Sequence, residues 1–394
     1  MKEYRNPNYK ARFMTVPRWV FSAPGRTELS GNHTDHQHGC VLAAAVNLDT
    51  VATVGLNGDD CIRVLSEGYP LCLISLDDLE KKTEETGTTA SLIRGIAARF
   101  TQLGCKVGGF DAYITSTVLP GSGLSSSAAF EVLIGTVINR LFFENRLTPV
   151  EIAQIGQWSE NNYFGKPCGL MDQTASSVGN IIGIDFADPA KPVVERIDFD
   201  FSSCGYALCI IDSGADHADL TDEYAAITVE LKKVCEIFGR QFLRDVDEDE
   251  FYSRILEVRR AAGDRAALRA IHVFEENKRV KRQIRALKDN DFDAFLSLVT
   301  ESGRSSWQLL QNVIPAGHTA HQEMAFAQAL AEKLLNGRGA CRVHGGGFAG
   351  TVQAFVPNDT VDSFRSGIEA VLGKGSCHIL SIRAEGGVLL EEYQ

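Results

Sequence analysis

A loop rich in glycine and serine, LPGSGLSSSAAF over Leu119–Phe130, has residue types suited to binding an anion. An alternating apolar run at residues 109–119 predicts a strand before it, and helical apolar spacing follows over residues 131–143. A loop that leads from a strand into a helix offers free backbone N–H groups and the positive end of the helix dipole. The residues expected to bind the anion are Pro120, Gly121, Gly123, Leu124, Ser125, Ser126 and Ser127.

The chemistry of this loop points to a nucleoside triphosphate. Its glycines let the backbone come close to phosphates, and its serine hydroxyls can cap the helix or reach a phosphate and its metal. The sequence contains no GxxxxGK[ST] pattern, which excludes a P-loop. Taken alone, the segment is explained equally well as a simple Gly/Ser connection.

A second polar segment, APGRTELSGNHTDHQHG over Ala23–Gly39, follows an expected strand and lies between apolar runs. Arg26 can place a fixed positive charge beside a phosphate during its transfer. A capped turn with an exposed polar face explains the segment as well, so both interpretations stay open at this point. The side chains that can hydrogen-bond a ligand with many hydroxyl groups are Glu28, Asn32, His33 and Asp35.

Asp172 lies in GKPCGLMDQTASS, residues 165–177, after a Gly/Pro turn and beside two apolar residues. A half-buried carboxylate there can orient or deprotonate a hydroxyl, which phosphoryl transfer requires, while a helix N-cap is the structural alternative. Glu160 ends the preceding expected helix and could reach a Mg²⁺ ion held by phosphates, because Mg²⁺ usually takes only one or two protein ligands. A solvated helix glutamate is the alternative for that residue.

The elements that must position these residues alternate between strands and helices. Strands are expected at residues 18–24, 40–58, 61–68, 180–188 and 193–201, with helices over 91–104, 131–143 and 149–163. After a break near residues 202–204, a buried strand at 206–214 precedes long helices between 219 and 336, and strands return at the end. The glycine-rich run at residues 341–355 is expected to be a turn between two strands. This order predicts an α+β fold with domains at 1–203 and 204–394.

Composition limits the classes of function. The 394 residues are 44% hydrophobic and 23% charged, as expected for a globular chain too long for one ordinary core. A net charge of −12 argues against a general nucleic-acid or membrane surface, and no apolar run reaches transmembrane length. The first residues lack an apolar signal core and the 10 cysteines are scattered, so a cytoplasmic enzyme with reduced thiols is expected.

In their order and spacing, the four segments resemble the motifs of the GHMP kinase superfamily, and most of all those of the galactokinases. The galactokinase pattern is roughly APGRVNLIGEHTDYNGG, PxGxGLSSSAA, GxPCGxMDQ and GxGFGG. This chain has APGRTELSGNHTDHQHG, LPGSGLSSSAAF, GKPCGLMDQ and HGGGFAG at the corresponding places. Weaker similarity between these motifs extends the resemblance over nearly the whole chain.

The resemblance implies a two-domain GHMP kinase fold with the active site between the domains. It implies a kinase, a monomer or homodimer, that uses ATP and Mg²⁺ to phosphorylate the anomeric hydroxyl of galactose or a galactose-like sugar. Asp172 matches the family's catalytic aspartate, and Arg26 matches the arginine that stabilises the transferring phosphoryl group. Sugar contacts are implied for Asn32, His33, Asp35, Gly169 and Tyr224, and Mg²⁺ binding for Glu160 with Ser126 or Ser127.

Departures from the pattern gather in the sugar-binding segment. Asn32 stands where the family has a glutamate, Thr27-Glu28 replace Val-Asn, and His36-Gln37-His38 replace Tyr-Asn-Gly. A carboxylate only accepts hydrogen bonds whereas an amide also donates them, and a pocket with mismatched polar groups rejects a sugar strongly. The substrate therefore stays open between galactose and a uronic acid, an N-acetyl or deoxy sugar, or a pentose. A non-catalytic regulator that binds sugar and ATP is a further alternative.

Overall fold

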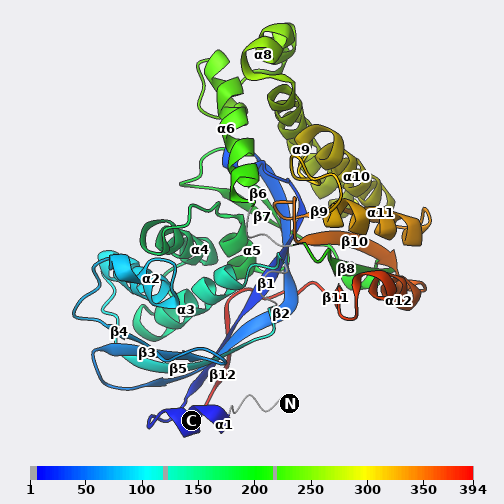
Figure 1. Ribbon diagram of the computed structural model, residues 1–394. Helices are drawn as coiled ribbons and strands as arrows, with labels where there is room; N and C mark the ends of the chain where they lie inside the picture. The colour runs from blue at the N-terminus through cyan, green and yellow to red at the C-terminus, as the bar shows by residue number, and fades with distance from the viewer. Residues whose placement is uncertain (1–6, 119–122, 216–219, 394) are drawn as a thin grey trace.

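The computed structural model describes residues 7–118, 123–215 and 220–393 and contains two sheets with helices packed around them (Figure 1). Pro120 and Gly121 of the predicted nucleotide loop lie outside the described residues. Over the parts of the chain that are described, no helix combines the length and the apolar character needed to cross a membrane.

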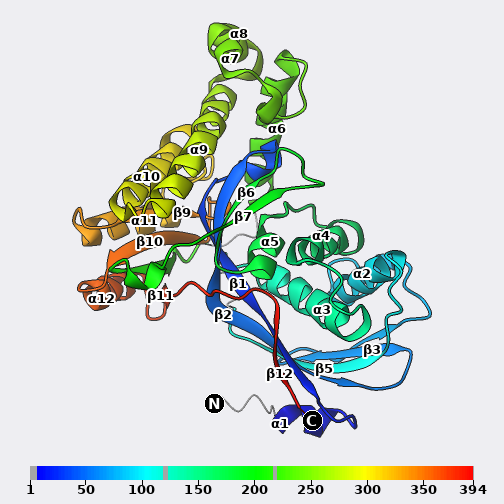
Figure 2. The same cartoon turned by 180° about the vertical axis from the view of Figure 1, so that it is seen from behind.

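The larger sheet has the strand order β12-β1-β2-β5-β3-β4, and β6 pairs with β2 and with β7. β1 and β2 are long antiparallel strands that run through the middle of the molecule in both views (Figures 1 and 2). Their apolar residues are buried almost continuously because both faces of the sheet are covered. The strands are β1 (Trp19–Ser30), β2 (Cys40–Leu56), β3 (Cys61–Ser66), β4 (Cys72–Ser75), β5 (Phe110–Ser116), β6 (Ile181–Asp185), β7 (Val193–Ile197) and β12 (Val388–Glu392).

Helices cover one face of this sheet (Figure 1). Side chains such as Phe21, Ile62 and Phe110 of the strands form one apolar core with Ile96 and Leu133 of two of these helices. Residues 7–12 form a short helix, α1 (Pro7–Arg12), near the outer end of the sheet. The covering helices are α2 (Thr89–Gln102), α3 (Ser126–Phe142), α4 (Pro149–Ser159) and α5 (Met171–Val178).

The smaller sheet has the order β11-β8-β10-β9 and carries helices on both sides (Figure 2). Helices α9 and α10 pack between it and the inner parts of β1 and β2, and helices α11 and α12 cover its other face. The strands are β8 (Tyr206–Asp212), β9 (Ala340–His344), β10 (Thr351–Pro357) and β11 (Cys377–Leu380). The helices are α6 (Thr221–Ile237), α7 (Glu248–Ser253), α8 (Ile255–Ala262), α9 (Asp264–Lys288), α10 (Phe292–Ser305), α11 (Glu323–Leu335) and α12 (Val361–Leu372).

One hydrophobic core joins the two halves of the chain. It contains Leu42 of β2, Ile210 of β8, Val280 of α9, and Phe295 of α10. The chain also crosses back at its end, because β12 pairs antiparallel with β1 in the larger sheet. A boundary between residues 203 and 204 therefore does not divide the structure into two independent sets of helices and strands, because the last strand, β12, packs with the N-terminal half.

Candidate active site

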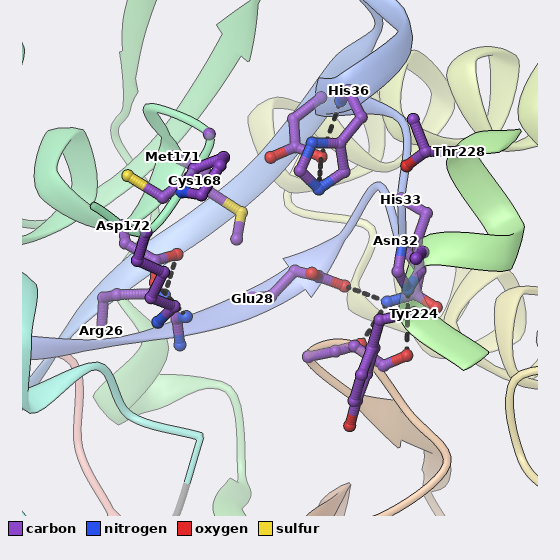
Figure 3. A pocket seen from close by; sticks show the side chains of 17 residues that line it. Arg26, Glu28, Asn32, His33, His36, Cys168, Met171, Asp172, Tyr224 and Thr228 are labelled. Carbon is purple, nitrogen blue, oxygen red and sulfur yellow. Dashed lines mark hydrogen bonds and ion pairs between the residues drawn. The ribbon is translucent and has the colours of Figure 1, made fainter. Parts of the chain in front are cut away.

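A cavity of about 770 Å³ lies where β1, the turn before α5, helix α6 and the β9–β10 loop meet (Figure 3). These elements are far apart in the sequence, so the fold assembles the site from three of the four motifs. Every residue that the sequence predicted to act on the sugar or the phosphoryl group lines this cavity. They are Arg26, Asn32, His33, Asp35, Gly169, Asp172 and Tyr224.

Arg26 and Asp172 form a two-point ion pair at one wall of the cavity. Arg26 Nε donates to Asp172 Oδ1 at 2.7 Å, and Nη2 donates to Oδ2 at 2.6 Å. Burial alone would raise the pKa of Asp172, but the charge and hydrogen bonds of Arg26, with a 2.7 Å bond from Ser125 Oγ, hold it below its ordinary value. The Arg26 side chain is 8% exposed and that of Asp172 is 31% exposed. The carboxylate is therefore ionised, fixed in position and open to a ligand.

The described part of the Gly/Ser loop is tied directly to this pair. Ser125 occupies the N-cap position of α3 with a left-handed φ of 57°, but its hydroxyl donates to Asp172 and does not cap the helix. The carbonyl oxygen of Leu124 accepts a bond from Arg26 N at 3.0 Å, and that of Gly123 accepts one from Arg26 Nη1. The helix-cap role expected for Ser125 is wrong: a capping residue usually has an extended backbone, whereas the backbone of Ser125 is left-handed and its hydroxyl accepts no bond from the N–H groups of the helix.

Asp172 is likewise not a helix cap. Helix α5 begins at Met171 after Leu170, and the Asp172 carboxylate is bonded to Arg26 and Ser125. The structure thus favours the chemical interpretation of this aspartate over the structural one.

Asp35 and Gly169 both line the cavity and approach each other closely. A Cβ atom at Gly169 would lie 2.2 Å from Asp35 Oδ2, so the glycine leaves room for the carboxylate. Asp35 Oδ1 accepts the backbone N–H of His36 at 2.8 Å, which fixes the carboxylate at the start of a short 3₁₀ turn. Both residues are placed where a ligand hydroxyl can reach them.

His33 and Tyr224 contact the glycine-rich turn that follows β9. His33 has a left-handed φ of 60°, and its Nε2 lies 2.9 Å from the carbonyl oxygen of Gly346. Burial lowers the pKa of His33 to about 4, so the ring is neutral at physiological pH and Nε2 donates. Tyr224 Oη donates to the carbonyl oxygen of Gly347 at 2.8 Å, and burial raises its pKa to about 12.

Glu160 belongs to a buried group next to the cavity. It follows α4 at the start of a π-helical turn, Glu160–Phe164. Gln173 Nε2 donates to Glu160 Oε2 at 2.9 Å and to Glu131 Oε2 at 3.0 Å, which links α3, α4 and α5. Burial raises the pKa of Glu131 well above its ordinary value, and the neighbouring Glu160 adds to this rise. Lys166 Nζ lies 3.6 Å from Glu160 Oε1.

Ser126 and Ser127 form the beginning of α3. Helices α3 and α4 are joined by a short connection, so the first turn of α3 and the last turn of α4 lie at the same end of the pair. Ser127 precedes Glu131 by four residues and therefore shares its helix face. Within the described residues, no group of three or more His, Cys, Asp or Glu side chains could hold a metal ion.

Sequence reasoning missed Arg342, a buried residue of β9 whose Nη2 donates to Glu28 Oε1 at 2.6 Å. It also missed Asn312, whose Nδ2 donates to Asn32 Oδ1 at 2.6 Å. The sequence does carry a signal for Arg342, because a charged side chain in the apolar run ACRV needs a buried partner. No local pattern marks Asn312, which only the tertiary fold brings to the site.

The three altered residues His36, Gln37 and His38 make contacts in different parts of the structure. His36 lines the cavity, whereas Gln37 Oε1 accepts the N–H of Leu243 at 3.1 Å and the His38 ring stacks on Phe242. Only one of these three departures from the family pattern can therefore meet the sugar. Gln37 and His38 instead attach the segment to Leu243 and Phe242, in the second half of the chain.

Comparisons with known proteins agree with this geometry. The family model described as GHMP kinases N terminal domain matches residues 91–180, and the galactokinase galactose-binding signature matches residues 7–56. A galactokinase of Glaesserella parasuis serovar 5 is 31% identical over 374 residues, 92% of this chain and 91% of the relative. A galactokinase of Actinobacillus pleuropneumoniae is 33% identical over 354 residues, which cover 87% of this chain and 86% of that one.

Solved structures share the same fold. The galactokinase of Lactococcus lactis, determined in complex with galactose, matches with a TM-score of 0.81 at 26% identity, over 95% of this chain and 96% of that one. A mevalonate kinase matches with a TM-score of 0.63 at 16% identity, over 93% of this chain and 99% of the other, which indicates the fold alone. The α+β GHMP kinase fold expected from the motifs is thereby confirmed.

Proposed function

Because this chain belongs to the galactokinase family, we propose that it transfers the γ-phosphate of ATP to the anomeric hydroxyl of galactose or a closely similar sugar. The observation that carries the proposal is the Arg26–Asp172 pair, which is bidentate, open to the cavity and bonded to the Gly/Ser loop. A regulator that only binds sugar and ATP has no need of this arrangement.

In the proposed reaction, Asp172 receives the anomeric hydroxyl. Its low pKa keeps it an acceptor, so it orients the hydroxyl oxygen for attack on the γ-phosphorus. It can take the hydroxyl proton as the new O–P bond forms and the bond from the γ-phosphorus to the oxygen of the leaving ADP breaks. Arg26 keeps the carboxylate in place and offers its positive charge to the phosphoryl group. ATP would place its phosphates along Gly123–Ser127, at the N-terminus of α3.

The donor atoms near Glu160 suit Mg²⁺. Serine hydroxyls and a carboxylate are hard oxygen ligands, and Mg²⁺ bound to phosphates needs few of them. Glu160 would hold the ion together with Ser127, because Ser127 shares a helix face with Glu131, which Gln173 bridges to Glu160. When bound, the ion would neutralise charge on the phosphates.

ADP release measured with Mg²⁺-ATP and a panel of sugars tests the proposal. The panel contains galactose, galactosamine, N-acetylgalactosamine, galacturonate, fucose, arabinose and glucose. Turnover with galactose or one of its close analogues is the expected result. An absence of turnover on every sugar, with ATP still bound, would contradict it and favour the regulator.

A further inference from the structure

Glu28 lies at the floor of the cavity and has one engaged carboxylate oxygen and one free oxygen. Oε1 accepts from Arg342 Nη2 at 2.6 Å and from Asn32 Nδ2 at 3.2 Å. None of the described residues donates a hydrogen bond to Oε2. Since Glu28 lines the cavity, Oε2 is the oxygen that a ligand can reach. Figure 3 shows Glu28 between the Arg26–Asp172 pair and the side chains of Asn32 and Tyr224.

Asn32, in contrast, has no donor left for a ligand. Its two N–H groups are used by Glu28 Oε1 and by the carbonyl oxygen of Gly345. Its Oδ1 accepts from Asn312 Nδ2 at 2.6 Å, and the residue is only 1% exposed. Asn32 therefore holds Glu28 and the β9–β10 loop in position, and its amide is poorly placed to select the sugar.

We propose that Glu28 is the carboxylate that accepts a hydrogen bond from a sugar hydroxyl in this pocket. The galactokinase pattern has asparagine at position 28 and glutamate at position 32, whereas this chain has the two residue types exchanged. Since the two side chains contact each other, the exchange keeps one carboxylate and one amide at the floor of the cavity. The inference rests on the proposed function and names the residue that recognises the sugar by a hydrogen bond.

The position of Glu28 on β1 suits this role. Residues two apart on a strand point to the same face and are separated by about 6.6 Å. Arg26, which holds Asp172, and Glu28 both line the cavity from β1. A pyranose with its anomeric hydroxyl at Asp172 therefore presents a hydroxyl of another ring carbon or of its C6 group to Glu28.

This arrangement selects a neutral sugar. The charge of Arg342 is already matched by Glu28, and Arg342 is fully buried behind it. A uronic acid would bring a second carboxylate towards Glu28, whereas the buried cations Arg26 and Arg342 are already paired with Asp172 and Glu28, and Lys166 is largely exposed. Galactose and neutral relatives that keep the hydroxyl are the expected class, and galacturonate is excluded.

Steady-state kinetics of four variants test the assignment: Glu28→Gln, Asn32→Glu, the double exchange Glu28→Asn/Asn32→Glu, and Asn32→Ala. Glu28→Gln should raise the KM for galactose by about 10- to 100-fold, the usual effect of losing a hydrogen bond to a charged group, with the KM for ATP unchanged. Asn32→Glu should also impair galactose binding, because it places a second carboxylate against Glu28. The double exchange should restore much of the loss.

Two outcomes would overturn the inference while the proposed function survived. One is an unchanged galactose KM in Glu28→Gln together with a raised galactose KM in Asn32→Ala, which would make Asn32 the residue that recognises the sugar. The other is a preference of the wild-type enzyme for galacturonate over galactose. This second measurement needs no variant, so it decides the matter even if Glu28→Gln fails to fold because Arg342 is left without its partner. Failure of the wild type to phosphorylate any sugar would instead contradict the proposed function itself.

Discussion

The Asp172 carboxylate is partly buried, paired with Arg26 and hydrogen-bonded by Ser125. These contacts determine how its ionisation, and with it the activity, should depend on pH. Burial opposes ionisation, but Arg26 and Ser125 outweigh it, so the pKa of Asp172 lies below its ordinary value of 3.8. A group with a lowered pKa stays ionised at all pH values above it, and its contribution is lost only as the pH falls through that low value.

We therefore expect kcat/KM of the wild-type enzyme to show no acidic limb from Asp172 between about pH 5 and 8. Ser125→Ala removes the 2.7 Å bond that helps to lower this pKa, so the limb should move upward in that variant. The pH profiles of kcat/KM for the two proteins check this. A wild-type limb near neutral pH that disappears in Asp172→Asn would contradict the assigned charge state.

The sequence predicted the residues of this site better than their contacts. Asp172, Arg26 and Asp35 could be singled out because their types and spacing match a family pattern. The partners of Ser125 and Asn32 could not, because a hydroxyl or amide has several possible partners and the fold chooses among them. The bonds from Ser125 to Asp172 and from Asn312 to Asn32 join segments far apart in the chain.

At the scale of helices, α3, α4 and α5 meet at the group of Glu131, Glu160 and Gln173. Burial and the neighbouring carboxylate of Glu160 raise the pKa of Glu131 well above the ordinary value. This shift favours the protonated form of Glu131, whose shape and polarity glutamine copies.

The two glutamates give a matched pair of variants. Glu160→Gln should raise the Mg²⁺ concentration required for half-maximal turnover by at least about tenfold, since the carboxylate proposed to bind the metal is lost. Glu131→Gln should change that concentration little. Mg²⁺ titrations of both variants, with Mn²⁺–nucleotide binding followed by electron paramagnetic resonance, make the comparison. Equal effects of the two substitutions would remove Glu160 from the metal site.

At Gly169, the turn before α5 leaves space for the Asp35 carboxylate. Gly169→Ala would place a Cβ atom 2.2 Å from Asp35 Oδ2, and the end of that side chain can move without disturbing the backbone. We expect the KM for sugar to rise by about tenfold or more, as for a displaced hydrogen-bonding partner, with the KM for ATP and the melting temperature nearly unchanged. Kinetics with each substrate varied in turn provide the test. A variant with wild-type sugar kinetics would show that Asp35 does not contact the sugar.

Helix and strand positions followed the apolar periodicity closely where segments were long. The strand expected at 206–214 corresponds to β8, and α9 is one of the long helices expected between residues 219 and 336. β4 and β12 were not predicted, because both are short and only half-buried, which leaves little alternation to detect. Their place in the sheet depends on pairing with distant strands.

For the whole molecule, the shared core predicts cooperative unfolding. Leu42, Ile210, Val280 and Phe295 come from both halves of the chain and pack in one cluster. β12 adds a second connection, because it pairs with β1. Separation of the halves would expose this core to water, at a cost of about 25 cal/mol for each Å² of apolar surface.

We accordingly expect one thermal transition in differential scanning calorimetry, and no cooperative transition for residues 1–203 expressed alone. Galactose and ATP should raise the transition temperature of the full chain, because ligands that bind the folded state stabilise it. Two well-separated transitions, or a stably folded fragment of residues 1–203, would instead support independent domains divided near residue 203.

The proposed reaction makes one new bond, the ester between the anomeric oxygen of galactose and the γ-phosphorus of ATP. Phosphorus and proton NMR of the product formed from galactose and Mg²⁺-ATP tests it most directly, because coupling between the phosphorus and the anomeric proton identifies the phosphorylated position. We predict galactose 1-phosphate from the wild-type enzyme and a fall in its rate of about 100-fold or more in Asp172→Asn, with ATP still bound. Asp185, which pairs with Arg244 outside the cavity, provides the matched control, and Asp185→Asn should retain activity. A phosphate on another hydroxyl, or an undiminished rate in Asp172→Asn, would contradict the account.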